Sequence, residues 1–200
     1  SVDELLQRAD LAMYQAKAAG RNTLRFFDPV MQAAVSARAR TEVDLRAALE
    51  RSEFLLHYQP VVDTDRLVTG VEALLRWRHP QRGMVSPAEF IPVAEQAGLI
   101  LPLGQWVLGA ACAQLVRWND SPATRKLTIA VNVSTRDLQQ KGFAERVARR
   151  IDASGVPAKR LRLEITESGL MDDPTHSVAL LYALREIGTP LSIDDFGTGY

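Results

Sequence analysis

Apolar residues recur at helical spacing over residues 5–16, and this pattern predicts a helix at the start of the chain. Ser1 and Glu4 form the pattern of a capping box before it, and Gly20 stands where a glycine ends a helix. A short run of β-forming residues, 23–27, predicts a strand. One helix and one strand cannot bury their own apolar faces, so we interpret this opening as the end of a domain that starts before Ser1.

A second helix is predicted over residues 29–51, a segment rich in Ala, Arg and Glu. Pro29 suits the first turn of this helix, where its missing N–H is not needed. We interpret the segment as a connector between two domains. A coiled-coil partner helix is the alternative, but the apolar positions are too few and too small to favour it.

The pattern then changes from helical spacing to alternation. Residues 54–58 and 67–75 are predicted to be strands, and the short polar segment 63–66 predicts that they pair antiparallel. Two helices are expected next, over 87–97 and 104–118.

Beyond residue 126, strands and helices alternate strictly. The expected elements are strands ending at Asn132, Glu164 and Asp194, separated by helices at about 143–153 and 174–187. Such alternation predicts parallel strands joined by right-handed crossovers. The three polar residues are 32 and 30 residues apart, a spacing that matches a βαβ unit of roughly 30 residues.

Composition narrows the class of protein. Lys and Arg together number 24, as do Asp and Glu, so the net charge of zero does not favour a general binder of nucleic acid or membrane surfaces. The hydrophobic fraction of 46% is that of a globular protein with a real core. Cys112, the single cysteine, excludes a disulfide within the chain and suits a reducing compartment. No signal peptide or membrane-spanning stretch is predicted.

Polar residues stand at the ends of the predicted strands. They are Glu72, Asn132, Glu164, Asp194 and Asp195. Because a parallel β/α sheet gathers such positions at one face, we expect an oxygen-rich cluster there. Close carboxylates repel one another unless a cation or a proton compensates. Oxygen ligands suit Mg²⁺ or Mn²⁺ and no His or Cys joins them, so the sequence predicts a divalent-metal site.

Each of these residues also has a simpler interpretation when taken alone. Glu72 fits a solvated strand edge, and Asp194 or Asp195 fits the N-cap of a following helix. Joint placement at equivalent strand positions is what favours the metal site. Two such ions could hold a phosphodiester and activate water. Gln59 could contact a base edge, and Arg76 could hold a phosphate.

A kinase-like triplet, Asp195-Phe-Gly197, is also present. A protein kinase needs in addition a glycine-rich loop, a strand lysine upstream and an asparagine after the catalytic loop. The chain contains none of these, so a kinase is excluded.

Several ordered motifs resemble the EAL-domain cyclic di-GMP phosphodiesterases. The longest are Tyr58-Gln-Pro60, Glu72-Ala-Leu-Leu-Arg-Trp77, Val131-Asn-Val-Ser134, Glu164-Ile-Thr-Glu167 and Asp194-Asp-Phe-Gly-Thr-Gly-Tyr200. Residues 1–28 resemble the C-terminal end of a GGDEF (diguanylate cyclase) domain, through Ala9-Asp10, Tyr14-Gln-Ala-Lys17 and Gly20-Arg-Asn22.

The resemblance implies an α/β fold, a modified TIM (β/α)8 barrel whose first strand is antiparallel. It implies metal-dependent hydrolysis of cyclic di-GMP to linear pGpG in bacterial signalling, with two Mg²⁺ or Mn²⁺ ions. The implied metal ligands are Glu72, Asn132, Glu164, Asp194 and Asp195. Glu167 would anchor an active-site loop, so that the implied catalytic residues are Glu72, Glu167 and Asp195. Gln59 and Arg76 would contact the dinucleotide.

The resemblance also implies an organisation of the chain. We expect residues 1–28 to end a GGDEF domain, 29–52 to form a connector helix, and 53–200 to be the N-terminal two-thirds of an EAL domain. The barrel would be incomplete at its C-terminus, so the 200 residues alone are expected to be inactive. The expected partners are cyclic di-GMP and a second copy in a homodimer, in the cytoplasm, with any membrane anchor elsewhere in the parent protein. A non-catalytic cyclic di-GMP receptor is the alternative.

Overall fold

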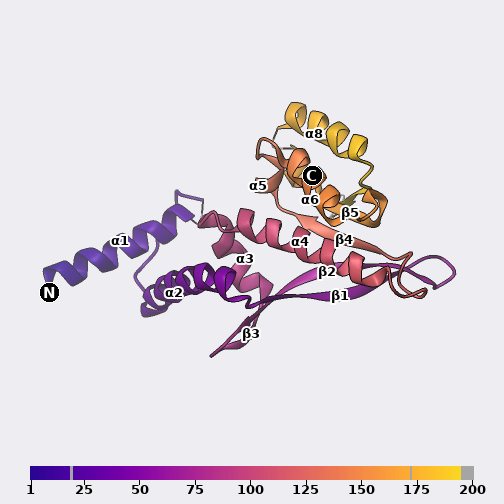
Figure 1. Cartoon of the computed structure of the whole chain (residues 1–200). Coiled ribbons are helices and arrows are strands. Elements are labelled where there is room, and N and C mark those ends of the chain that lie inside the picture. The colour runs from indigo at the N-terminus through magenta and orange to yellow at the C-terminus, as the bar shows by residue number, and fades with distance from the viewer. Residues whose placement is uncertain (19, 172, 195–200) are drawn as a thin grey trace. The chain divides into compact units, whose positions relative to one another are not determined.

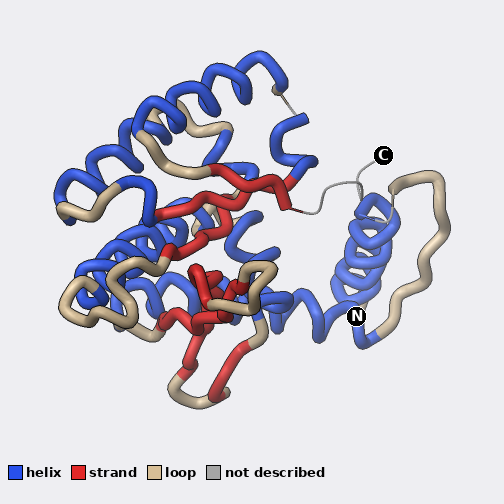
Figure 2. Tube along the Cα trace, turned by 90° about the vertical axis from the view of Figure 1, so that its right-hand side faces the viewer, coloured by secondary structure: helices blue, strands red, loops and turns tan. Residues whose placement is uncertain are grey.

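The structure, a computed structural model, describes residues 1–18, 20–171 and 173–194 of the chain (Figures 1 and 2). The chain divides into two compact units, residues 1–47 and 48–200. None of the helices in the described ranges is both long and apolar enough to cross a membrane.

The first unit contains helix α1 (Val2–Ala18) and most of α2 (Pro29–Arg51). The capping box at its start is confirmed, because Glu4 N donates to Ser1 Oγ at 3.2 Å. Gly20 has φ +96° and its N–H donates to the carbonyl of Lys17, as expected for a glycine that ends a helix. Pro29 is the first residue of α2.

The predicted strand at 23–27 is wrong, because residues 23–28 have no regular secondary structure. An isolated strand leaves its backbone N–H and C=O groups without partners. The described part of the chain provides no strand that pairs with this segment. Its β-forming composition therefore does not decide its conformation.

The second unit alternates strands and helices in the expected order. Its elements are β1 (Phe54–Val62), β2 (Val68–His79), β3 (Gly83–Val85), α3 (Pro87–Gln96), α4 (Ile100–Trp118), β4 (Thr128–Val133), α5 (Thr135–Leu138), α6 (Phe143–Ser154), a 3₁₀ turn (Ala158–Arg160), β5 (Leu161–Thr166), α7 (Glu167–Met171), α8 (Pro174–Ile187) and β6 (Leu191–Asp194).

The strands form one open sheet in the order β1-β2-β4-β5-β6, with β3 paired to β2 (Figure 1). β1 pairs antiparallel with β2, whereas β2, β4, β5 and β6 pair in parallel. The antiparallel first strand and the parallel remainder are both as predicted. The arrangement is that of a TIM-like barrel fold, not closed within the described residues.

Helices cover one face of this sheet and form the core with it. α4 packs against β4, and α6 packs against both α4 and α8 (Figure 1); the helices lie beside the strands in Figure 2. Odd-numbered strand residues such as Val131, Leu163 and Ile165 are buried in this core. Because strand side chains alternate between faces, the even-numbered residues point away from the helices.

Several element boundaries differ from those predicted. β2 continues beyond the expected end at residue 75 to His79, because β1 and β3 both pair with its second half. Glu72 therefore lies within β2 and not at the end of a strand. α4 begins at Ile100 and not at 104, since Pro102 is tolerated in the first turn of a helix. The short elements β3, α5 and α7 were not predicted.

A buried arginine, Arg160, lies at the end of the sheet where β4 and β5 begin. Arg160 is only 6% exposed, and its guanidinium donates to the carbonyls of Leu127 at 3.0 Å and Thr124 at 3.2 Å and to Asn119 Oδ1. Burial lowers the pKa of Arg160. The carbonyl dipoles of the loop before β4 offset the cost of burying its charge.

Replacing Arg160 by methionine should lower the free energy of unfolding by about 2–4 kcal/mol, because several buried carbonyls lose their donor. Urea denaturation of the full-length protein measures this loss. The exposed Arg125 provides a matched control, and Arg125→Gln should change stability by less than about 0.5 kcal/mol. Equal denaturation midpoints for Arg160→Met and wild type would show that the carbonyl contacts are unimportant.

Candidate active site

The predicted ligand residues of β2, β4 and β5 lie on the sheet face that points away from the helices. Glu72, Asn132 and Glu164 all occupy even-numbered positions, and the residues on either side of each are buried in the core. Asn132 is directly opposite Glu164 in the parallel pairing of β4 and β5. Asn132 Nδ2 donates to Glu72 Oε1 at 2.7 Å, which brings β2 into the same cluster.

Asp194 extends this cluster to β6. It is the last residue of that strand and lies opposite Thr166 at the end of β5. The pKa of Glu164 is raised, first by burial and then by the negative charges of Glu72 and Asp194, with Arg162 opposing. The structure thus brings together four of the five predicted ligand residues. Asp195, the fifth, lies outside the described residues.

These residues fit a divalent cation by their donor chemistry. As placed, no three of the described Asp, Glu, His or Cys residues are close enough to hold an ion by themselves. The cluster, however, also contains the amide of Asn132, whose Oδ1 is a ligand type that Mg²⁺ and Mn²⁺ accept. A bound cation would offset the repulsion that raises the pKa of Glu164.

The two residues expected to contact substrate lie on the same face of the sheet. Gln59 is exposed on β1 and directly opposite Glu72, so their side chains are neighbours. Arg76 lies four residues beyond Glu72 on β2, about 13 Å along the strand. Arg76 lines a cavity of about 350 Å³ together with Asn132 and Thr166. The side chains of Asn132 and Arg76 thus border the same cavity.

Glu167 is the sequence neighbour of a residue that lines this cavity. It is the first residue of α7, directly after Thr166, and its side chain is partly buried. Thr166 Oγ1 accepts from Gly169 N at 3.3 Å and stabilises this turn. α7 packs against α5, so the segments that follow β5 and β4 support each other.

Ser134 and Asp137 are two residues of this region that the sequence reading missed. Ser134 caps α5 by accepting from Asp137 N at 3.1 Å, and its hydroxyl donates to the Asp137 carboxylate. The Ser-x-x-Asp spacing is a capping-box pattern and could have revealed the pair. A Cβ on Gly104 would lie 2.9 Å from Asp137 Oδ2, so any larger residue there would require this carboxylate or α4 to shift. The hydrogen bonds between Ser134 and Asp137 stabilise the start of α5, which follows Asn132 by two residues.

The pKa of Asp137 is raised by burial, which outweighs the hydrogen bonds from Ser134 and the charge of Arg146. The folded state therefore binds this proton more tightly than the unfolded state does, and ionisation of Asp137 lowers stability as the pH rises through its raised pKa. Asp137→Asn should increase the free energy of unfolding at pH 7 by up to about 1 kcal/mol, and the gain should vanish when Asp137 is protonated in both states. Urea denaturation of both proteins at pH 7 and at about pH 3 measures it. A gain that is independent of pH would contradict this role of burial.

The sequence profile of the EAL domain family matches residues 42–200, which include every element of the cluster. The chain belongs to the EAL domain family. The Glu-Ala-Leu motif that gives the family its name is present as Glu72-Ala-Leu74. Its glutamate, Glu72, accepts the hydrogen bond from Asn132 Nδ2.

Relatives of the EAL domain chain include proteins with assigned activities. This chain is 43% identical over 198 residues to the bifunctional diguanylate cyclase/cyclic di-GMP phosphodiesterase MucR of Pseudomonas aeruginosa. The match covers 98% of this chain and 29% of MucR. The chain is 41% identical over 199 residues to the cyclic di-GMP phosphodiesterase NbdA of the same species, covering 99% of this chain and 25% of NbdA. The chain thus spans between a quarter and a third of the length of these relatives.

Solved structures show the same fold. The structure of the PaMucR phosphodiesterase in complex with c-di-GMP superposes with a TM-score of 0.76 at 43% sequence identity. The match covers 80% of this chain and 65% of that one. The fold class predicted from the sequence is therefore confirmed.

Proposed function

We propose that this chain is part of a metal-dependent phosphodiesterase that hydrolyses cyclic di-GMP to linear pGpG. The observation that carries the proposal is the meeting of Glu72, Asn132, Glu164 and Asp194 at one face of the sheet, with Asn132 bonded to Glu72. The 43% identity to MucR, which is named as a cyclic di-GMP phosphodiesterase, supports the same reaction.

Each residue of the cluster has a proposed part in holding two Mg²⁺ or Mn²⁺ ions. Glu72, Glu164 and Asp194 would supply carboxylate oxygens, and Asn132 would supply Oδ1 while its Nδ2 keeps Glu72 in place. Asp195 is proposed as a further ligand. Such ions supply a water of lowered pKa and stabilise the charge that develops on the phosphate.

Residues beyond the cluster would position the dinucleotide. Arg76 is proposed to bind a phosphate through its fork of N–H donors, at the 350 Å³ cavity that Asn132 also lines. Gln59, next to Glu72 in the sheet, is proposed to contact a guanine. Glu167 is proposed to hold the segment after β5 in place, since it starts the helix that packs on α5.

Binding of substrate can be separated from hydrolysis in the full-length protein. With divalent ions chelated, calorimetry should show that Arg76→Gln weakens cyclic di-GMP binding by about tenfold, the effect of losing one charge-assisted contact. Arg185→Gln, which changes an exposed arginine of α8, should leave the affinity unchanged. Wild-type protein that binds no cyclic di-GMP would contradict the proposed substrate, and equal binding by Arg76→Gln would remove Arg76 from the site.

We also propose that residues 1–28 are the end of a diguanylate cyclase domain and that 29–52 connect it to the EAL domain. The match to the bifunctional MucR covers 98% of this chain and supports the arrangement. The sequence of the parent protein before Ser1 tests it: a GGDEF signature there is expected, and a different domain would contradict it.

A further inference from the structure

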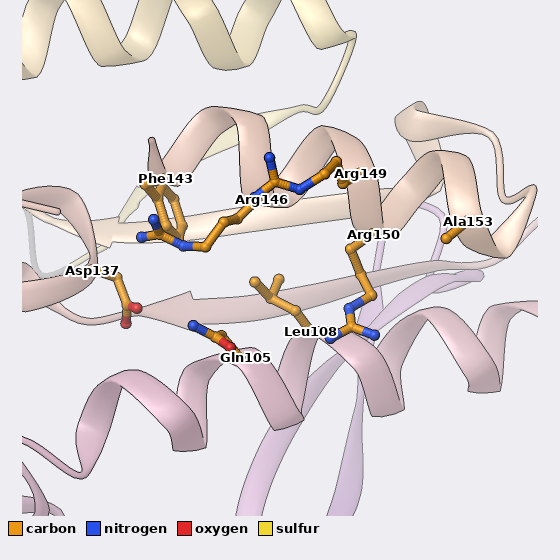
Figure 3. Close-up of a pocket in the computed structure, with 8 residues that line it drawn as sticks. All are labelled: Gln105, Leu108, Asp137, Phe143, Arg146, Arg149, Arg150 and Ala153. Atoms are coloured by element: carbon orange, nitrogen blue, oxygen red, sulfur yellow. The ribbon is translucent and has the colours of Figure 1, made fainter. Parts of the chain in front are cut away.

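A second cavity lies between helices α4 and α6, within the helical layer of the EAL domain. It has a volume of about 300 Å³ and is lined on the α6 side by Phe143, Arg146, Arg149 and Arg150. Gln105 and Leu108 of α4 face them, and Asp137 of α5 lies at one end (Figure 3). None of these residues is among the ligand residues proposed above.

The three arginines give one wall of this cavity a strong positive charge. Arg149 and Arg150 follow Arg146 by three and four residues, so all three lie on the same side of α6. None of them forms a salt bridge within the described ranges of the chain. Like charges at this spacing repel each other unless an anion compensates.

The guanidinium of Arg146 is held in position by its surroundings, and that of Arg150 lies close to α4. Arg146 lies over the ring of Phe143, 5.8 Å from its centroid, and donates to the Lys141 carbonyl at 2.9 Å. Arg150 extends to α4, since its Cζ lies 3.4 Å from where a Cβ of Gly109 would be. Packing of this kind reduces the side-chain entropy lost when a ligand binds.

The other end of the cavity has acceptor character. Figure 3 shows Arg150 and the Asp137 carboxylate at opposite ends, with Gln105 of α4 between them on the opposite side from α6. The Asp137 carboxylate already accepts from Ser134; its remaining lone pairs and the Gln105 amide can accept from hydroxyl groups. Figure 3 also shows the guanidinium of Arg146 toward the Asp137 end, so this end presents a cation together with its acceptors.

We infer that this cavity binds a small phosphate monoester that also carries hydroxyl groups, as a sugar phosphate does. Arginine N–H forks match the geometry of phosphate oxygens, and the arginines that line the α6 side would bind that group. Gln105 and Asp137 would accept from the hydroxyls. A volume of about 300 Å³ is at the lower end of the range for small-molecule sites. The inference does not depend on the reaction proposed above.

Calorimetry on the full-length protein tests the inference with ribose 5-phosphate, inorganic phosphate and ribose as probes. Ribose 5-phosphate should bind more tightly than inorganic phosphate, ribose should not bind, and added salt should weaken both phosphate probes. The double substitution Arg149→Gln and Arg150→Gln should weaken both phosphate probes by at least about tenfold. Gln105→Ala should weaken ribose 5-phosphate but not inorganic phosphate.

Arg125→Gln removes an exposed arginine elsewhere and should change none of these affinities. Thermal melting of each variant confirms its fold, which these exposed substitutions should preserve. The inference is overturned if wild type binds neither phosphate probe, or if the double variant binds both as well as wild type. It is also overturned if cyclic di-GMP competes with ribose 5-phosphate, because binding would then be at the proposed active site.

Discussion

Glu72→Ala is expected to lower the turnover of cyclic di-GMP by the full-length protein about a thousandfold or more. The substitution removes a proposed metal ligand and leaves Asn132 Nδ2 without its acceptor at 2.7 Å. Loss of a single group that stabilises charge in a transition state costs about 10²–10³ in kcat. Loss of a ligand that also holds the metal should cost at least as much.

Two control variants make this result specific. Glu72→Gln keeps the size of the side chain but removes its charge, so it should retain the fold and lose most of the activity. Glu186→Ala removes an exposed glutamate of α8 and should leave kcat unchanged. Steady-state kinetics together with thermal melting measure both. A Glu72→Ala protein that keeps its fold and more than about a tenth of wild-type kcat would contradict the assignment of Glu72 as a ligand.

Gly70→Ala should have a large effect on stability, lowering the free energy of unfolding by about 2–4 kcal/mol. A Cβ at Gly70 would lie 2.2 Å from Thr128 Oγ1 and 2.9 Å from the Thr128 backbone oxygen. Gly70 and Thr128 are partners in the parallel pairing of β2 with β4. The two strands would have to separate, and Glu72 would move away from Asn132.

The backbone contact distinguishes this explanation from a side-chain clash. Thr128→Ala alone should cost less than about 1 kcal/mol, and it removes the nearer of the two clashing atoms. Combined with Gly70→Ala it should restore only part of the stability, because the Thr128 carbonyl remains in the way. Urea denaturation of the three variants tests this. A Gly70→Ala protein as stable as wild type would show that the strands yield easily at this point.

The parallel part of the fold follows from local patterns in the sequence. Alternation placed β4, β5 and β6 correctly, and it put Glu164 on the opposite face from Leu163 and Ile165, as the structure shows. These strands are short apolar runs with polar residues on one side, so periodicity is informative. It also predicted that Asn132 and Glu164 would be neighbours.

What the sequence did not predict depends on contacts between distant segments. β2 extends to His79 because two other strands pair with it, although charged residues interrupt its apolar pattern. α5 and α7 are too short to show a period. The close approach of Asp137 to α4 at Gly104 joins two segments that are far apart in the sequence, so local patterns do not predict it. The wrong strand at 23–27 is the opposite case, a β-forming segment with no partner in the described chain.

The most direct measurement is the product formed when the purified full-length protein is incubated with cyclic di-GMP and Mg²⁺ or Mn²⁺. Chromatography should show linear pGpG accumulating, no product when the ions are chelated, and recovery when they are restored. A well-folded protein that binds cyclic di-GMP but yields no pGpG with either ion would contradict the account and identify a receptor.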